Sequence, residues 1–448
     1  MNGNKNQGQE QMPKVLIITY YWPPAGGPGV QRVLKFVKYL HQFGWEPVIL
    51  TVKNGEFPAI DHSLSDNIPN SLYIYKSKLL EPSSLYKKFI GWKKSEPLPV
   101  ALLLKKDLNW KKRLSHWIRL NIFIPDAKIG WFVFAVRMGK HIIKIHKPDF
   151  IFSSSPPQTV QLIARRLSRW SKIPWIADFR DPWTDIYHYN SVRKTYPAVV
   201  LDKYLERKVL QDADRIVTVS KHFSILLKQK IPQQNKISVI MNGYDPDDFS
   251  TLKSLEKFER FTIAYSGKIS EEQNPTFLWA DISDLVHRRT DFKTNFQLLL
   301  MGNISQSIIQ EIEKFGLKEH LIYTGYIHHR DVILNLSRSH ILLLLVPYTQ
   351  KNEGIIPGKI FEYIATGNEI LGIGNPNGDA ADLIKTTRLG IMVDYNTDFK
   401  PFIINQFEKW INNKQYRTKL KSYKNYSRVF QTEKLIQIMD EIKKRNIK

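Results

Sequence analysis

Short apolar runs alternate with amphipathic helical stretches along this chain, and they do so in two successive series. The first run, residues 14–20, is followed by the glycine-rich loop 21–29, a helical stretch that ends near Gly44, and a second run at 46–52. Continuous apolar runs of this kind are typical of strands buried on both faces of a parallel sheet. This order therefore predicts a βαβ unit with a glycine-rich first turn.

The same rhythm continues to the end of the chain. Further strands are expected at residues 149–153, 174–178, 215–220, 236–241, 261–266, 296–301, 320–324, 340–346, 369–373 and 390–393. Helices are expected around 159–170 and 199–211, whereas residues 76–148 give no clear pattern. The polar segment 245–259 interrupts the series. Two series of alternating strands and helices predict two doubly wound α/β domains.

The predicted organisation has five parts. An N-terminal Rossmann-like domain at 14–245 and a C-terminal one at 260–425 flank a linker at 246–259. A flexible tail at 1–13 precedes them, and a helix at 426–448 is expected to pack back on the N-terminal domain. Because open parallel sheets bind ligands beyond the carboxyl ends of their strands, a ligand cleft is expected between the two domains.

The composition excludes several kinds of chemistry. The chain has no cysteine, so it can form no disulfide, thiolate metal site or cysteine nucleophile. Its 12 histidines show no spacing typical of a metal site, and His328 with His329 is interpreted as a solvated loop pair. The acidic residues at 245–248 are interpreted as turn and cap residues. We therefore expect no metal and no cofactor.

The chain is strongly basic. Its net charge is +24, and residues 76–145 hold 16 Lys and Arg against 4 Asp and Glu. Such a field attracts nucleic acid, phosphorylated substrates or an acidic lipid surface, although a solvated surface explains a charge run equally well. No run reaches the roughly 18 apolar residues of a membrane-spanning helix, and no secretory signal is evident. A cytoplasmic protein is expected, and a peripheral position on the inner face of a membrane stays open.

Two glycine-containing loops are candidate anion sites. Gly26 and Gly27 precede a helix, whose free N–H groups and positive dipole end favour an anion. Ser266, Gly267 and Lys268 end the first strand of the second domain, where the Lys could bind a diphosphate. The alternatives are a plain strand-to-helix turn and a surface Lys beside a turn glycine.

Two further segments carry charged side chains at strand ends. Lys359 and Glu362 lie three residues apart at the start of a helix, so a phosphate could meet the Lys and ribose hydroxyls the Glu. The alternative is a surface salt bridge. The second segment follows a first-domain strand, where it is a candidate active site or an ion pair that pins a loop; its members are Asp178, Arg180, Asp181 and Trp183.

Together these motifs resemble family 4 of the retaining glycosyltransferases. The segment from Gly26 to Arg32 is similar to the family's donor-side glycine loop, and residues 239–245 resemble the entry into the domain linker. The loop at 265–268 resembles the one that opens the second domain, and residues 324–326, which include Tyr326, resemble the loop near the nucleotide base. The most specific likeness is at residues 357–367, which resemble the family's Glu-x7-Glu helix. The resemblance spans nearly the whole chain.

The resemblance implies a GT-B fold and transfer of a sugar from a UDP- or GDP-sugar donor to a saccharide or lipid-linked acceptor. It implies retention of configuration without a metal, in cell-envelope polysaccharide or glycolipid synthesis. The implied donor-binding residues are Gly26, Gly27, Ser266, Gly267, Tyr326, Pro357, Gly358 and Glu362. Lys268, Lys359, Arg180 and Asp181 would be catalytic, and Asp178 and Trp183 would position the sugar or acceptor.

The sequence departs from the family pattern at three places. Gly354 stands where the first Glu of the motif is expected, with Glu353 one residue early. Lys268 stands where the family usually has Arg, and Arg180 lies in a strand end where it often has His.

The basic segment also has aromatic residues, which together suit an anionic bilayer. The residues expected to face a membrane are Trp92, Lys93, Lys94, Lys111 and Lys112. A degenerate, non-catalytic transferase stays open because of Gly354, and so do two other functions. One is a sugar-nucleotide 2-epimerase of similar build, and the other is a nucleic-acid-binding protein, which the pI near 9.7 favours but for which no motif is present.

Overall fold

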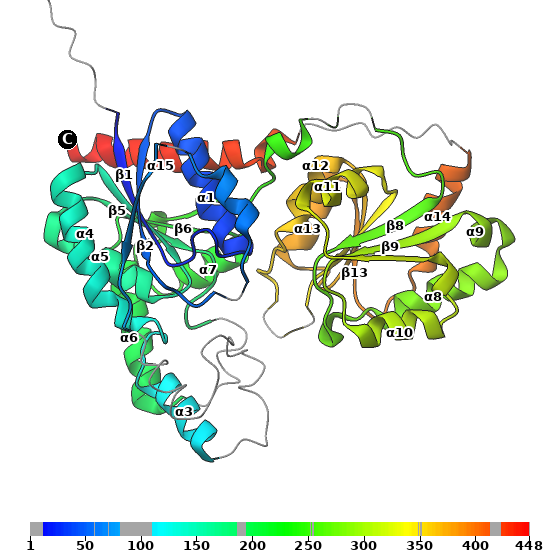
Figure 1. Cartoon of the computed structure of the whole chain (residues 1–448), viewed down its shortest axis with the longest axis horizontal. Coiled ribbons are helices and arrows are strands. Elements are labelled where there is room, and N and C mark those ends of the chain that lie inside the picture. The colour runs from blue at the N-terminus through cyan, green and yellow to red at the C-terminus, as the bar shows by residue number, and fades with distance from the viewer. Residues whose placement is uncertain are drawn as a thin grey trace, which may run out of the picture. The chain divides into compact units, whose positions relative to one another are not determined.

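The protein folds into two compact α/β units in a computed structural model (Figure 1). The structure describes residues 12–57, 59–69, 71–80, 110–185, 194–250, 252, 255–347, 349, 352–412 and 423–447. Unit 1 comprises Met1–Val219, Phe223–Ile240 and Thr432–Lys448, and unit 2 comprises Ser220–His222 and Met241–Gln431.

Unit 1 is built on a seven-stranded parallel sheet in the order β3-β2-β1-β4-β5-β6-β7. Its strands are β1 (Lys14–Thr19), β2 (Glu46–Val52), β3 (Tyr73–Ser77), β4 (Phe150–Ser155), β5 (Trp175–Phe179), β6 (Arg215–Thr218) and β7 (Ile237–Val239). The chain moves outward in one direction from β1 and then returns to add β4 on the other side. This topological switch point is where doubly wound folds place ligands.

Helices cover both faces of this sheet (Figure 1). The helices of unit 1 are α1 (Pro28–Gln42), α3 (Trp110–Asn121), α4 (Phe132–His146), α5 (Thr159–Ser171), α6 (Tyr196–Asp212), α7 (Lys221–Lys228) and α15 (Arg428–Ile447), of which α3 extends away from the sheet in Figure 1. Alternate residues of β1 pack into two different cores, as the period of a strand requires. Leu16 packs into the core that includes α4 and α5, and Val15 into the core that includes α1. Met439 of α15 belongs to this second core.

Unit 2 repeats this design with a six-stranded parallel sheet in the order β10-β9-β8-β11-β12-β13. The strands are β8 (Phe261–Ser266), β9 (Phe296–Met301), β10 (Leu321–Gly325), β11 (Ile341–Leu345), β12 (Glu369–Ile373) and β13 (Gly390–Val393). The helices are α8 (Thr276–Arg288), α9 (Thr290–Asn295), α10 (Gln306–Lys314), α11 (His329–Arg338), α12 (Lys359–Thr366), α13 (Asp379–Thr387) and α14 (Lys400–Asn412). The switch point lies between β8 and β11.

The predicted fold class, two doubly wound Rossmann-like sheets, is confirmed. The structure adds β3 and α4, which lie in or beside the segment 76–148 that the pattern left unassigned. Tyr73 of β3 is half exposed, so this edge strand lacks the continuous apolar run of a buried strand.

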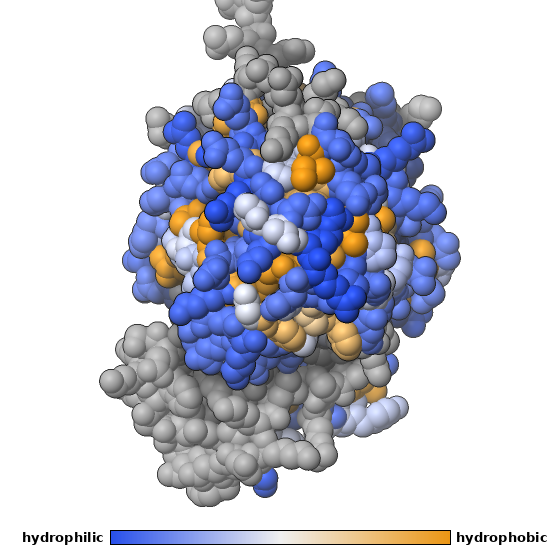
Figure 2. Space-filling model, turned by 90° about the vertical axis from the view of Figure 1, so that its right-hand side faces the viewer, coloured by the Kyte–Doolittle hydropathy of each residue, from blue (hydrophilic) through white to orange (hydrophobic). Residues whose placement is uncertain are grey.

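The surface of unit 2 that faces the viewer in Figure 2 is mostly hydrophilic, and its apolar residues lie in small separate groups. Across the described ranges, no helix has both the length and the apolar character needed to cross a bilayer.

Candidate functional site

Three glycines end neighbouring strands of unit 2. Gly267, Gly302 and Gly325 follow or close β8, β9 and β10, and their φ angles of 122°, 112° and 65° lie in the left-handed region. The N–H of Gly267 donates to the carbonyl of Met301 at 2.8 Å, and that of Gly302 to the carbonyl of Gly325 at 2.7 Å. A Cβ on Gly302 would overlap the backbone of Gly267. Bare backbone therefore lines the carboxyl ends of these three strands.

Lys359 brings a cation to this strand end. Its Nζ donates to the carbonyl of Ser266 at 2.6 Å and lies 3.9 Å from the centre of the Tyr265 ring. Burial lowers the pKa of Lys359 to about 7, against the opposing effect of the Glu362 carboxylate. Ser266 is itself buried and contributes its backbone oxygen to the contact.

The same Lys begins α12, which concentrates positive potential. Gly358 is the N-cap, and no side chain caps the free N–H groups of this helix. An ammonium at a helix N-terminus adds to the positive end of the dipole instead of compensating it. Pro357 precedes the cap, and a Cβ on Gly358 would have no neighbour within 4 Å. The arrangement suits an anionic ligand such as a diphosphate.

Glu362 lies one turn later and pairs with a residue that the sequence interpretation missed. Its Oε1 lies 3.0 Å from Nε2 of His329, the first residue of α11. The two side chains are 20% and 47% exposed, so the pair is reachable from solvent. The interpretation of His329 as a loop residue was wrong, since it begins α11, although its side chain is solvent-exposed as expected. Nothing in the local sequence around residues 328 and 329 indicates a contact with Glu362.

Two other predicted residues of unit 2 are exposed. The Lys268 side chain is exposed, while its carbonyl accepts a hydrogen bond from the Tyr265 hydroxyl at 2.7 Å. Tyr326 follows β10 and is 81% exposed, which leaves its ring available for stacking. Glu353, next to Gly354, lies 3.9 Å from His222 through Oε2 and Nε2.

In unit 1, Arg180 lies against the glycine-rich loop. A Cβ built on Gly29 would overlap Nη1 of Arg180. The guanidinium also donates from Nε to the carbonyl of Ser155 at 2.9 Å and from Nη2 to that of Pro156 at 2.7 Å. Burial lowers the pKa of Arg180, although the nearby Asp178 and Asp181 carboxylates oppose the shift. The structure thus brings together two segments that the sequence analysis proposed as separate sites.

The glycine loop itself is shaped by Gly27. This residue has a φ of 103° and precedes α1 as its N-cap. Only glycine adopts that conformation without strain. Gly26 donates its N–H to the carbonyl of Ala59 at 2.9 Å, and a Cβ there would lie 3.2 Å from that of Asp61.

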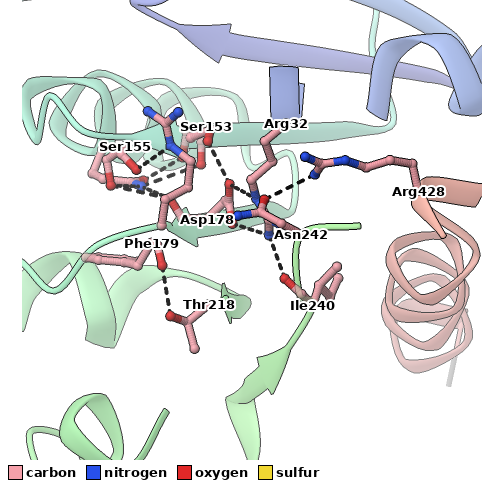
Figure 3. A network of polar contacts seen from close by, with 12 residues as sticks. Arg32, Ser153, Ser155, Asp178, Phe179, Thr218, Ile240, Asn242 and Arg428 are labelled. Atoms are coloured by element: carbon pink, nitrogen blue, oxygen red, sulfur yellow. Dashed lines mark hydrogen bonds and ion pairs between the residues drawn. The ribbon is translucent and has the colours of Figure 1, made fainter. Parts of the chain in front are cut away.

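Asp178 lies in the interior of unit 1 instead of facing a ligand. Its carboxylate accepts two hydrogen bonds from Arg32, at 3.0 Å and 2.8 Å, and one from Ser154 at 2.6 Å (Figure 3). Arg32 also donates to the carbonyl of Ile240 at 2.9 Å. Both ionic side chains are fully buried. A buried carboxylate must be paired, and this pairing replaces the expected contact with a sugar or acceptor.

Trp183 also lies inside the unit. It is 3% exposed, and its Nε1 donates to Asp202 at 2.7 Å. Asp181, in the same segment, is partly buried. Of the residues expected to face a membrane, Trp92, Lys93 and Lys94 lie outside the described residues. Lys111 and Lys112 lie in α3, but their side chains are also outside the described part.

In the described ranges, no three His, Asp or Glu side chains gather in a way that could hold a metal ion. The polar groups described above are ammonium, carboxylate and backbone N–H groups in unit 2, and guanidinium and carboxylate groups in unit 1.

Residues 26–248 match the family model described as Glycosyltransferase Family 4. The fold is similar to that of a glycosyltransferase from Rickettsia africae, with a TM-score of 0.61, 16% identity and coverage of 96% of this chain and 98% of that one. Anabaena HepE in complex with UDP gives a TM-score of 0.59 at 11% identity and coverage of 96% and 100%. Sucrose-phosphate synthase from Thermosynechococcus elongatus gives 0.57 at 14% identity and coverage of 97% and 98%. Comparison with curated proteins found no match.

Proposed function

Because the chain belongs to glycosyltransferase family 4, with the two-sheet GT-B fold, we propose that it moves a sugar from a UDP-sugar to a saccharide or lipid-linked acceptor with retention. The observation that carries the donor assignment is the contact of Lys359 with Ser266 beside Gly267, at the carboxyl end of β8. It combines a cation, a helix N-terminus and bare backbone, which together suit a diphosphate. The complex of HepE with UDP supports uracil as the base.

The proposed catalytic effect is stabilisation of the leaving group. As the bond between the anomeric carbon and the diphosphate oxygen breaks, negative charge develops on the diphosphate. Lys359, Lys268 and the N–H groups at Gly358 would stabilise that charge. Binding would transfer the Lys359 ammonium from the Ser266 carbonyl to a phosphate oxygen, which is a stronger acceptor. The leaving phosphate would accept the proton of the acceptor hydroxyl, so no metal is required in this proposal.

Glu362 and Tyr326 would hold the nucleoside. The carboxylate can accept hydrogen bonds from the ribose hydroxyls, and its contact with His329 at 3.0 Å would fix its orientation. The exposed Tyr326 ring would stack on the base. Glu362 shares α12 with Lys359, whereas Tyr326 is placed by the end of β10.

In unit 1, we assign Arg180 and Asp181 to the sugar or acceptor. Arg180 lies against the loop of Gly26, Gly27 and Gly29, so a group bound at that loop would meet a guanidinium. An anionic acceptor, such as one linked to a lipid phosphate, would suit this charge. The proposed setting is cell-envelope polysaccharide or glycolipid synthesis.

A donor screen tests the proposal. The purified full chain is incubated with UDP-, GDP- and dTDP-sugars, and thermal stability and nucleotide release are followed. Stabilisation and slow hydrolysis by a UDP-sugar are expected. Stabilisation by GDP alone would overturn the choice of base. Conversion of a UDP-sugar to its 2-epimer would favour an epimerase, and retention on duplex RNA or DNA without any response to nucleotides would favour a nucleic-acid-binding role.

A further inference from the structure

Helix α6 of unit 1 buries acidic side chains that an ordinary surface helix would expose to water. Two of its three acidic residues, Asp202 and Glu206, are four apart and lie on the buried side, with exposed fractions of 0% and 1%. The third, Asp212, ends the helix and pairs with Arg165. An ordinary amphipathic helix places carboxylates in water and apolar side chains in the core. In α6, two carboxylates lie in the interior instead.

Each buried carboxylate is fully paired. Asp202 accepts from Trp183 at 2.7 Å and from the ammonium of Lys194 at 2.6 Å. Glu206 accepts from the ammonium of Lys230 at 2.7 Å and from the hydroxyl of Thr184 at 2.6 Å. These partners come from outside the helix, so the tertiary structure fixes which side of α6 faces inward.

The outward side of α6 is consequently apolar and aromatic. Its large side chains follow helical spacing, and they are Tyr196 (82% exposed), Val200 (47%), Leu201 (46%) and Tyr204 (55%). A soluble surface rarely groups large apolar residues on one helix face without a binding role.

The same side carries only positive charge. Lys203 and Arg207 are exposed and share the outward face, and Lys208 lies with its Nζ 5.5 Å from the centre of the Tyr204 ring. Because both carboxylates next to them point inward, no acidic residue of this stretch neutralises these cations at the surface.

Helix α3 adds similar side chains nearby. Oδ1 of Asn121, its last residue, accepts from the N–H of Thr195 at the start of α6, at 2.6 Å. Leu114 and Trp117 of α3 are about half exposed, and Arg113 is exposed. The two helices project together from the rest of unit 1 in Figure 1.

We propose that the outward face of α6 docks on an anionic lipid bilayer. Tyr and Trp are the residues that settle at the membrane interface, and Lys and Arg bind the negative headgroups. A protein surface would have to supply an apolar patch ringed with acidic residues, whereas an anionic bilayer supplies both properties over any area. Charge complementarity and the aromatic content therefore favour lipid.

This inference deepens the proposed function, since a lipid-linked acceptor would lie at that surface, but it is testable without donor or acceptor. The full chain is mixed with vesicles of phosphatidylcholine alone and of phosphatidylcholine with phosphatidylglycerol, and the bound fraction is measured by sedimentation. We expect binding to the anionic vesicles at about physiological salt, where surface charges are screened beyond roughly 8 Å.

Two variants separate the contributions. K203E/R207E/K208E should weaken binding to anionic vesicles by about a hundredfold or more. Each of the three basic residues is expected to contribute a similar part of the binding free energy. Y196S/V200S/Y204S should bind at low salt and release at high salt, because only the electrostatic attraction would remain. The matched control K293E/K314E/K318E changes the net charge equally on exposed Lys of unit 2 and should stay within about twofold of the parent.

Vesicle binding and UDP binding are measured separately, so a failure of the membrane proposal can be told from a failure of the proposed donor site. All variants should keep the UDP-induced thermal shift, which shows that they are folded. Parent-like vesicle binding by both α6 variants would overturn the proposal, as would a parent that ignores anionic vesicles. A parent dimer that the Ser variant converts to monomer would also overturn it, in favour of a protein interface.

Discussion

The guanidinium of Arg32 donates two hydrogen bonds, of 3.0 Å and 2.8 Å, to the carboxylate of Asp178, and both side chains are fully buried. The pair joins α1 to the end of β5, 146 residues further along the chain. Arg32 also holds the carbonyl of Ile240 just after β7. One ion pair thus connects α1, which follows the glycine loop, to the carboxyl ends of β5 and β7.

Removing one partner should therefore be costly. R32M leaves Asp178 buried without its counter-ion, so we expect a loss of about 3–5 kcal/mol in the free energy of unfolding. The double variant R32M/D178N removes both charges and should lose less than the sum of the two single variants. Urea unfolding of the four proteins gives the coupling energy. A change of less than about 0.5 kcal/mol in R32M would contradict the structural role of the pair.

Binding of UDP should depend on pH through Lys359. Burial lowers its pKa to about 7 in the free protein, and a bound diphosphate favours the charged form. Affinity should therefore be greatest below pH 7 and should fall by up to about tenfold per pH unit above it. Calorimetry from about pH 7 to pH 9 avoids the titration of the terminal phosphate, whose pKa is about 6.

Two substitutions check this assignment of the pH dependence. K359R should flatten the profile, because Arg stays charged throughout this range. The exposed Lys314 of α10 offers a matched control, and K314R should keep the parent profile. A parent affinity that is flat between neutral and alkaline pH would place the diphosphate away from Lys359.

Glu362 should allow the site to distinguish UDP from 2′-deoxy-UDP. A hydrogen bond to a carboxylate contributes about 1.5–3 kcal/mol, so the parent should prefer UDP by roughly tenfold or more. E362A should bind both nucleotides with similar affinity. An unchanged preference in E362A would exclude the carboxylate as the ribose acceptor.

His329 should act through Glu362. H329A should reduce the preference for UDP only in part, and H329Q should restore it, because an amide N–H can replace the imidazole donor to Oε1. The neighbouring His328 is exposed, so H328A should behave as the parent in the same titration. Identical behaviour of H329A and H328A would show that the contact with Glu362 has no role in binding.

Gly29 should be intolerant of a methyl group because of Arg180. A Cβ there overlaps Nη1, so G29A must displace a guanidinium that is bonded to Ser155 and Pro156. We expect a loss of about 1–3 kcal/mol in stability, together with reduced sugar transfer. In the R180A background the same substitution should add little. Full additivity of the two changes would argue against this contact.

Part of the candidate site could be predicted from local sequence. Lys359 and Glu362 follow from helical spacing, and Ser266 and Gly267 from their place after an apolar run. The contact between Lys359 and Ser266 depends on how the start of α12 comes to lie beside the end of β8, 93 residues earlier in the chain. His329 was missed because its partner Glu362 lies 33 residues away and no local pattern joins them.

Sequence alone determined the succession of strands and helices and the two doubly wound sheets, because local periodicity and apolar runs record which segments can be buried. The direction in which charged residues face was decided only in the tertiary structure. Asp178 of β5 and Asp202 and Glu206 of α6 are buried because their hydrogen-bonding partners come from other elements. A buried charge is stable only where a partner of opposite charge or a hydrogen-bonding group lies next to it. The sequence of one local segment does not specify which residues from other elements will lie there.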